Sequence, residues 1–157
     1  MKIRCLAVDD EPLALEQIAG YIRRTPFLEL NAACRSGFEA IDAVSGQKTD
    51  LIFADINMPD LNGLDFVRSL HIKPLVVFTT AFSEYAVEGF RVEPLDYLLK
   101  PITYSDFLKA ANRARLMLES ENRIEDENSE SEENLFVKID YRIVRIALKD
   151  IIYIEGM

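Results

Sequence analysis

The sequence predicts an α/β fold in which a five-stranded parallel sheet is doubly wound, with helices on both faces. Short apolar runs alternate five times with segments of helical period over residues 1–118. The runs are rich in β-branched and aromatic residues, and turn residues separate the two patterns. Strands that are apolar on both sides are typical of parallel sheets covered by helices. An acidic linker and a short β fragment follow this region.

The five apolar runs are short enough to be buried strands. Their side chains favour strands over helices, and turn residues bound them. In chain order, the expected strands are Ile3–Val8, Leu28–Ala33, Leu51–Ala54, Leu75–Phe78 and Tyr97–Leu99.

Five other segments repeat apolar residues at helical spacing. Asp10-Glu11-Pro12 begins the first, because proline at the first helical position loses no hydrogen bond. Ser36-Gly37 precedes the second, and Thr103 or Ser105 is placed to cap the last. The apolar faces are Leu15, Ile18 and Ile22; Phe38 and Ile41; Phe66 and Leu70; Ala86 and Phe90; and Phe107, Ala111, Ala114 and Leu118.

Composition excludes several classes of protein. With 49% apolar and 29% charged residues, the chain is ordinary for a globular protein. No apolar stretch approaches the roughly 20 residues of a membrane span, and the N-terminus does not have the pattern of a secretory signal. Cys5 and Cys34 are isolated and form no CxxC pair, so we expect buried structural thiols. A cytoplasmic location is expected.

The net charge of −9 is concentrated in one segment. Residues 119–134 hold eight acids and one arginine, a net charge of −7, and Ile124 is the single aliphatic residue. Such a segment buries too little apolar surface to offset the cost of ordering. We therefore expect one domain at 1–118, a solvated acidic linker at 119–134 and an incomplete β-patterned fragment at 135–157, whose two or three strands are too few for an independent core.

Polar side chains follow several of the predicted strands. In an open parallel sheet, ligands bind outside the carboxyl ends of the strands. Acids that repel one another there suit a hard divalent cation such as Mg²⁺ or Mn²⁺, which takes oxygen ligands and keeps exchangeable waters. The groups are Asp9 and Asp10 after the first strand, Asp55 after the third, Thr80 after the fourth and Lys100 after the fifth, with a main-chain oxygen from Asn57.

Asp55 is the candidate nucleophile of this constellation. Its carboxylate can attack phosphorus and form an aspartyl phosphate. Lys100 as a point charge and Thr80 as a hydrogen-bond donor would hold the other phosphoryl oxygens. A lone acid at a strand end is usually a turn residue, so the prediction depends on the joint placement of these groups.

Residues 1–118 resemble a response-regulator receiver domain, the CheY-like form of the flavodoxin-like fold. The motifs that carry the resemblance are VDDEP (8–12), DINMPDLNG (55–63), FTTA (78–81) and DYLLKP (96–101). The resemblance implies that Asp55 is the phosphoacceptor of a two-component system, charged by a sensor histidine kinase. Asp9 and Asp10 match the metal-binding pair, and Asn57 matches the residue whose main-chain oxygen reaches Mg²⁺. The protein would then be no enzyme beyond its own phosphorylation and slow dephosphorylation.

The same resemblance assigns a conformational switch. Thr80, followed by the small Ala81, matches the switch hydroxyl, and Tyr97 matches the aromatic residue that rotates inward when Thr80 moves. Lys100 matches the lysine that contacts phosphate, and Pro101 matches a proline that is typically cis. We expect phosphorylation to promote a homodimer through the fourth helix, fifth strand and fifth helix.

Phe82 and Asn57 bear on the lifetime of the phosphoryl group. In receivers, the position two residues after Thr80 borders the path of the hydrolytic water. The large apolar ring of Phe82 cannot orient water, and Asn57 is not an efficient base. We therefore expect slow decay, although packing of Phe82 on its loop remains an alternative explanation of that residue.

The tail resembles the opening strands of a LytTR-type DNA-binding domain. The matching stretch is FVKIDYRIVRIALKDIIYIEG (136–156), and the form FTTAFSEYAVEGF (78–90) is common in receivers paired with that domain. The family's later strands and DNA-contacting loops are missing from this stretch. We therefore expect transcription control and DNA binding from the full-length protein, but no DNA binding by this chain alone.

Three other functions compete with this interpretation. A haloacid-dehalogenase-type phosphatase needs a second acid two residues after its nucleophile, where this chain has Asn57. A dinucleotide-binding domain needs a GxGxxG turn after a strand, and the sequence has none. A receiver-shaped interaction module that is never phosphorylated would not need the acceptor, metal pair, hydroxyl and lysine that this chain retains.

Overall fold

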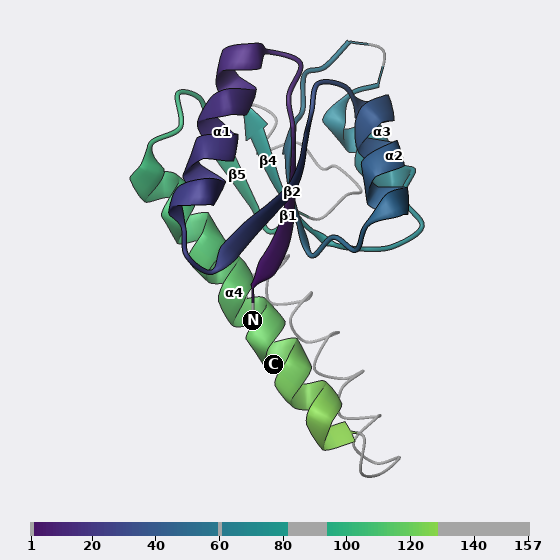
Figure 1. Ribbon diagram of the computed structural model, residues 1–157, viewed down its shortest axis with the longest axis vertical. Coiled ribbons are helices and arrows are strands. Elements are labelled where there is room, and N and C mark those ends of the chain that lie inside the picture. The colour runs from purple at the N-terminus through teal and green to yellow at the C-terminus, as the bar shows by residue number, and fades with distance from the viewer. Residues whose placement is uncertain (1, 60, 82–93, 129–157) are drawn as a thin grey trace, which may run out of the picture. The chain divides into compact units, whose positions relative to one another are not determined.

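Strands and helices alternate along the chain, as the sequence predicts (Figure 1). The computed structural model describes residues 2–59, 61–81 and 94–128. The described elements are β1 (Ile3–Val8), α1 (Pro12–Arg24), β2 (Leu28–Cys34), α2 (Gly37–Gly46), β3 (Leu51–Asp55), α3 (Gly63–Arg68), β4 (Leu75–Thr80), β5 (Asp96–Leu99) and α4 (Tyr104–Asn128).

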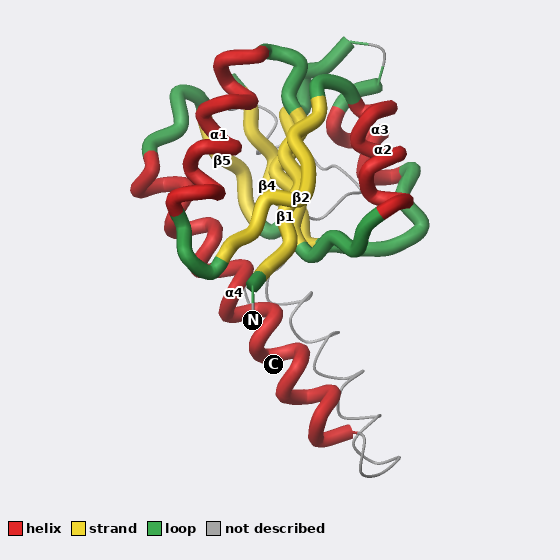
Figure 2. Tube along the Cα trace, viewed as in Figure 1, coloured by secondary structure: helices red, strands yellow, loops and turns green. Residues whose placement is uncertain are grey.

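The sheet has the strand order β2-β1-β3-β4-β5, and every neighbouring pair is parallel (Figure 2). Helix α1 lies on one face of the sheet, whereas α2 and α3 lie on the other (Figure 1). The predicted five-stranded, doubly wound fold is therefore confirmed. Because all strands run the same way, their carboxyl ends meet at one edge, where a ligand site is expected.

Three expectations fall outside the described residues. They are the helix around Ala86 and Phe90, the side chain of Phe82 and the β-patterned fragment at 135–157. The helix expected as the fifth is therefore labelled α4. Within the described part of the chain, no helix combines the length and the apolar character needed to cross a membrane.

Side chains and proline begin the helices where the sequence predicts. Pro12 occupies the first turn of α1. Ser36 accepts a hydrogen bond from the main-chain N–H of Glu39 at 3.1 Å and caps α2. Thr103, rather than Ser105, caps α4, because its Oγ1 accepts from the main-chain N–H of residue 106 at 3.1 Å.

The core is built on large aromatic rings, with one exception to the predicted pattern. Phe53 of β3 stacks on Phe107 of α4, with 4.8 Å between ring centroids, and both are fully buried. Phe38 was expected on the buried face of α2, but it is 59% exposed. The buried stripe of α2 begins instead at Gly37, which approaches the side chain of Leu61 so closely that a Cβ would collide with it. The buried face of α2 is therefore set by close packing of small residues. The spacing of hydrophobic residues alone predicts the wrong position for this face.

Helix α4 extends beyond the expected end of the first domain. Its buried positions include Phe107, Ala111 and Ala114, as the spacing predicts. The chain divides into two compact units after Ala114, and α4 continues to Asn128, so the first ten residues of the expected linker are helical. A helix satisfies its own backbone hydrogen bonds, and glutamate has a good helix propensity, so an acidic segment can be helical without burying apolar surface. The domain boundaries at 118 and 134 remain predictions.

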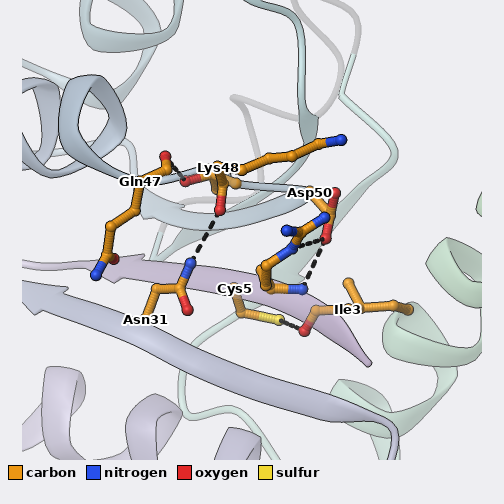
Figure 3. A network of polar contacts seen from close by, with 8 residues as sticks. Ile3, Cys5, Asn31, Gln47, Lys48 and Asp50 are labelled. Carbon is orange, nitrogen blue, oxygen red and sulfur yellow. Dashed lines mark hydrogen bonds and ion pairs between the residues drawn. The ribbon is translucent and has the colours of Figure 1, made fainter. Parts of the chain in front are cut away.

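A polar network connects strands near the amino-terminal edge of the sheet. The register of β1 against β2 shifts so that Asn31 faces no partner in β1, and its side chain donates to the carbonyl oxygen of Lys48 at 2.9 Å (Figure 3). The main-chain N–H and Nε of Arg4 both donate to Oδ2 of Asp50, at 2.9 and 3.1 Å. The loop before β3 is thereby fixed to β1 and β2.

Both cysteines are buried and free, as predicted. Burial raises the pKa of the Cys5 thiol to about 12 and that of Cys34 to about 11. Neither thiol forms an appreciable amount of reactive thiolate near neutral pH, so both serve packing.

Candidate functional site

Three carboxylates meet at the carboxyl-terminal edge of the sheet. Asp9 and Asp10 follow β1, and Asp55 is the last residue of the neighbouring strand β3. One oxygen from each residue can be chosen so that the three atoms lie within 4.8 Å of one another. Asp9 is 3% exposed and Asp55 is 4% exposed, so two of the three acids are withdrawn from water.

Main-chain contacts fix Asp9 and occupy one of its oxygens. Its N–H donates to the carbonyl oxygen of Cys34 at 3.0 Å. Its Oδ1 accepts from the N–H of Glu11 at 2.9 Å, where α1 begins. Its Oδ2 is buried and has no hydrogen-bond partner among the described residues. Oδ2 is therefore the oxygen of Asp9 that is open to a cationic partner.

A glycine allows the chain after Asp55 to fold back on it. Gly63 donates its N–H to the carbonyl oxygen of Ile56 at 2.9 Å. A Cβ on Gly63 would collide with the carbonyl oxygen of Asp55. Oδ1 of Asp55 accepts from the N–H of Asn57 at 3.3 Å. The turn therefore holds both the main chain and the side chain of Asp55.

Lys100 supplies positive charge to the cluster. Its Nζ lies 2.9 Å from Oδ2 of Asp9, 3.5 Å from Oδ2 of Asp55 and 4.0 Å from Oε1 of Glu11. The 2.9 Å contact with Asp9 is an ion pair. Burial lowers the pKa of Lys100, but the two aspartates more than offset this, so its net pKa is raised. Lys100 is therefore charged at any physiological pH.

The electrostatics of Asp55 differ from those of an ordinary surface acid. Burial raises its pKa to about 7, and the neighbouring charge of Asp9 contributes in the same direction. Lys100 and the N–H of Asn57 act in the opposite direction and offset part of this rise. A further positive charge at this position would stabilise the ionised form of Asp55.

The cluster opens into a shallow pocket of about 230 Å³, lined by Asp10, Glu11, Asp55, Asn57, Ala81 and Lys100. Five of these six residues are candidates from the sequence. Glu11 is the addition, because it was interpreted only as part of the start of the first helix. Its position in the VDDEP motif, directly after Asp9 and Asp10, is the signal that could have identified it.

Thr80, Tyr97 and Pro101 do not line this pocket. Thr80, at the end of β4, is 1% exposed. Tyr97 of β5 is partly buried, and its ring packs against Phe78 with 5.9 Å between centroids. The peptide bond before Pro101 is cis, as the resemblance implies. Phe82 lies outside the described residues.

The donor set fits a hard divalent cation. Mg²⁺ and Mn²⁺ prefer carboxylate, carbonyl and water oxygens, and they require few protein ligands. The buried Oδ2 of Asp9 lacks a hydrogen-bond partner among the described residues, and it lies in the three-carboxylate cluster. Asn57 lines the same pocket, where its main-chain oxygen would add a neutral ligand.

Comparison with known proteins agrees with the geometry. The family model for the response regulator receiver domain matches residues 5–112. Transcriptional regulatory protein BtsR of Escherichia coli K12 is 40% identical over 115 residues, which cover 72% of this chain and 48% of BtsR. Sensory transduction protein LytT of Bacillus subtilis is 32% identical over 155 residues, 96% of this chain and 64% of LytT. The chain thus spans about half the length of BtsR.

A solved structure gives the same result for the fold. The response regulatory domain of protein mrkE from Klebsiella pneumoniae superimposes with a TM-score of 0.67 and 30% sequence identity. The match covers 75% of this chain and 99% of the mrkE domain. The residues that the family model matches contain the acidic cluster and most of the five-stranded sheet. The chain therefore belongs to the response-regulator receiver family.

Proposed function

We propose that Asp55 accepts a phosphoryl group from a sensor histidine kinase, with Mg²⁺ or Mn²⁺ bound, and that this charge controls a LytTR-type output domain. The observation that carries the proposal is the position of Lys100, whose Nζ lies within 3.5 Å of both Asp9 and Asp55 and which lines the same pocket as Asp55. An ammonium group placed there can pair first with the carboxylate and, after transfer, with the oxygens of a phosphoryl group.

The transfer would be a direct displacement at phosphorus. A carboxylate oxygen of Asp55 forms the new bond to phosphorus as the phosphorus–nitrogen bond of the kinase phosphohistidine breaks. The electron pair of that bond returns to the imidazole nitrogen. Lys100 holds the phosphoryl oxygens during transfer, and the Asn57 N–H keeps the attacking carboxylate oriented.

A divalent cation would be held by the carboxylates of Asp9, Asp10 and Asp55 and by the main-chain oxygen of Asn57. When bound, it supplies positive charge that offsets repulsion between these acids and the incoming phosphoryl oxygens. The buried Oδ2 of Asp9 supports this assignment, since no described residue gives it a hydrogen bond.

We propose that the new charge is transmitted through Thr80 and Tyr97. The phosphoryl oxygens favour a state in which Thr80 turns towards them, and Tyr97 moves into the space that Thr80 leaves. Homodimerisation through the surface that includes β5 and α4 is the expected result. The 52% exposure of Leu99 on the edge strand β5 supports an association surface there. Sedimentation with a phosphate mimic and Mg²⁺ tests the dimer, and unchanged association would exclude it.

The output is proposed to be control of transcription by a LytTR-type domain. The resemblance of residues 136–156 supports this, as does the LytT match, which extends over 155 residues and so beyond the receiver region. BtsR is named as a transcriptional regulatory protein. We assign the receiver to 1–118, the linker to 119–134 and the start of the output domain to 135–157. DNA binding then belongs to the full-length protein, in the cytoplasm.

A phosphatase is the competing function, and Asn57 argues against it. Turnover needs an acid that protonates the leaving group, and the amide of Asn57 cannot donate a proton in this way. The resemblance to receivers implies that Phe82 borders the path of the hydrolytic water, and on this ground the phosphoryl group should persist. Incubation with p-nitrophenyl phosphate distinguishes the functions: the receiver shows at most one phosphoryl group per chain, whereas sustained release of p-nitrophenol would identify a phosphatase.

A further inference from the structure

The loop that follows β5 carries Lys100 and is held at three points. At its start, the N–H of Lys100 donates to the carbonyl oxygen of Thr80 at 2.8 Å. At its end, Thr103 caps α4. Between these two points, the hydroxyl of Tyr21 donates to the carbonyl oxygen of Ile102 at 2.8 Å. Tyr21 lies on α1, 81 positions away in the sequence.

The direction of the Tyr21 hydroxyl is set by aromatic packing. The ring of Tyr21 lies 5.4 Å from that of Phe107 and 5.3 Å from that of Tyr104, measured between centroids. Phe107 in turn stacks on Phe53 of β3 at 4.8 Å. Since β3 also carries Asp55, the same packed core supports both the hydroxyl and the acceptor strand.

The carbonyl of Ile102 needs this hydroxyl. Ile102 is 3% exposed, and buried carbonyl groups are almost always hydrogen-bonded. Pro101 has no N–H with which to fix the loop, so the contact to Ile102 helps to fix the chain between Lys100 and Thr103. The Nζ distances of 2.9 Å to Asp9 and 3.5 Å to Asp55 depend on that path.

We propose that Tyr21 is a positioning residue for phosphoryl transfer. Its hydroxyl fixes Ile102, and through it the position from which Lys100 reaches the oxygens on Asp55. This inference rests on the proposed function of Asp55 as phosphoacceptor. Tyr21 touches neither acceptor nor donor, and it acts only through Lys100.

Tyr104 provides a matched control in the same cluster. Its hydroxyl lies 3.0 Å from Oγ1 of Thr25. The Thr25 hydroxyl itself donates to the carbonyl oxygen of Tyr21 at 2.8 Å. Tyr104 is therefore the donor in the first contact. Tyr104→Phe removes one hydroxyl from the cluster, as Tyr21→Phe does, but the lost bond ends on Thr25 and not on the loop. Both variants keep the aromatic ring and its packing.

The test compares rates of Asp55 phosphorylation by a small acyl phosphate with Mg²⁺. We expect Tyr21→Phe to lower the rate about three- to tenfold, the effect of one lost hydrogen bond on the placement of Lys100. Tyr104→Phe should stay within about twofold of wild type, since the loop keeps its contact. In a Lys100→Ala background, Tyr21→Phe should have no further effect, because coupled residues are not additive.

Three outcomes would overturn the inference: Tyr21→Phe reacts like wild type, both tyrosine variants slow equally, or the Tyr21→Phe effect persists without Lys100. NMR shifts of the Lys100 side chain give a second readout, which should move in Tyr21→Phe and not in Tyr104→Phe. If wild type itself is not labelled on Asp55, the proposed function fails, and the NMR comparison still decides whether Tyr21 positions Lys100.

Discussion

The ammonium nitrogen of Lys100 lies 2.9 Å from Oδ2 of Asp9, a buried oxygen for which no described residue provides a hydrogen bond. The same nitrogen lies 3.5 Å from Asp55. One lysine therefore compensates two buried acids on neighbouring strands. A group that balances these acids is also placed to meet a phosphoryl group on Asp55.

Removal of this lysine tests its part in the reaction. We expect Lys100→Ala to slow phosphorylation of Asp55 by a small acyl phosphate by about 10²-fold, comparable to the loss of one preorganised donor to a developing charge. Lys73→Ala, which removes an exposed lysine before β4, is the control and should react like wild type. Equal rates for Lys100→Ala and wild type would show that the ion pairs serve only the fold.

Metal binding can be measured as a gain in stability. Mg²⁺ should raise the melting temperature of wild type, because a ligand that binds only the folded state stabilises it. For Asp10→Asn, the Mg²⁺ concentration needed for the same rise in melting temperature should be about tenfold higher or more, since the cation loses a charged ligand. Asp42→Asn, an exposed acid on α2, should keep the full response. If both variants respond alike, the acidic cluster is not the binding site.

The raised pKa of Asp55 predicts a pH-dependent stability without divalent cation. Its pKa is about 7 in the fold against 3.8 for the ordinary group, so the folded protein keeps a proton that the unfolded chain releases. This contribution is fully present below about pH 4 and is lost as the pH rises to about 7. Asp55→Asn removes the free-energy cost of burying an ionised carboxylate. At about pH 8, its midpoint of urea unfolding should therefore be higher than that of wild type.

The pH comparison has a defined control. The advantage of Asp55→Asn should disappear towards about pH 3, below the ordinary pKa of 3.8, where wild-type Asp55 is largely protonated in both the folded and the unfolded state. Asp42→Asn, which changes an exposed acid, should follow wild type throughout. A constant difference between Asp55→Asn and wild type across this range would contradict the electrostatic origin.

Gly63 should be intolerant of a side chain because of its approach to Asp55. We expect Gly63→Ala to lower the free energy of unfolding by about 1–3 kcal/mol, as overpacking does, and to slow phosphorylation. Gly20→Ala is the matched control, because a Cβ there meets nothing within 4 Å inside α1. It should instead gain about 0.5–1 kcal/mol from helix propensity. Urea unfolding of the two variants checks both signs.

General rules of parallel sheets were enough to predict the acidic cluster. The sequence places Asp9 and Asp55 after two strands of one parallel sheet, whose common direction brings both to the same edge. The same holds for Lys100 after β5. The structure adds that the strands of Asp9 and Asp55, β1 and β3, are neighbours. The caps at Ser36 and Thr103 were also predictable, since they depend on residues close in sequence.

Other features depend on contacts that no local pattern encodes. The exposure of Phe38 follows from the close approach of Gly37 to Leu61, which hydrophobic spacing does not describe. The bond from Tyr21 to Ile102 joins residues 81 positions apart and depends on how three aromatic rings pack. Such contacts become visible only in three dimensions.

The central claim is that Asp55 is the residue phosphorylated. Wild type, Asp55→Asn and the control Asp65→Asn should be incubated with a small acyl phosphate and Mg²⁺, and their masses measured before and after peptide mapping. Asp65 is an exposed acid of α3, paired with Arg68. We expect one added phosphoryl group, mapped to Asp55, in wild type and Asp65→Asn, and none in Asp55→Asn. Equal labelling of all three proteins, or a label on another residue, would contradict it.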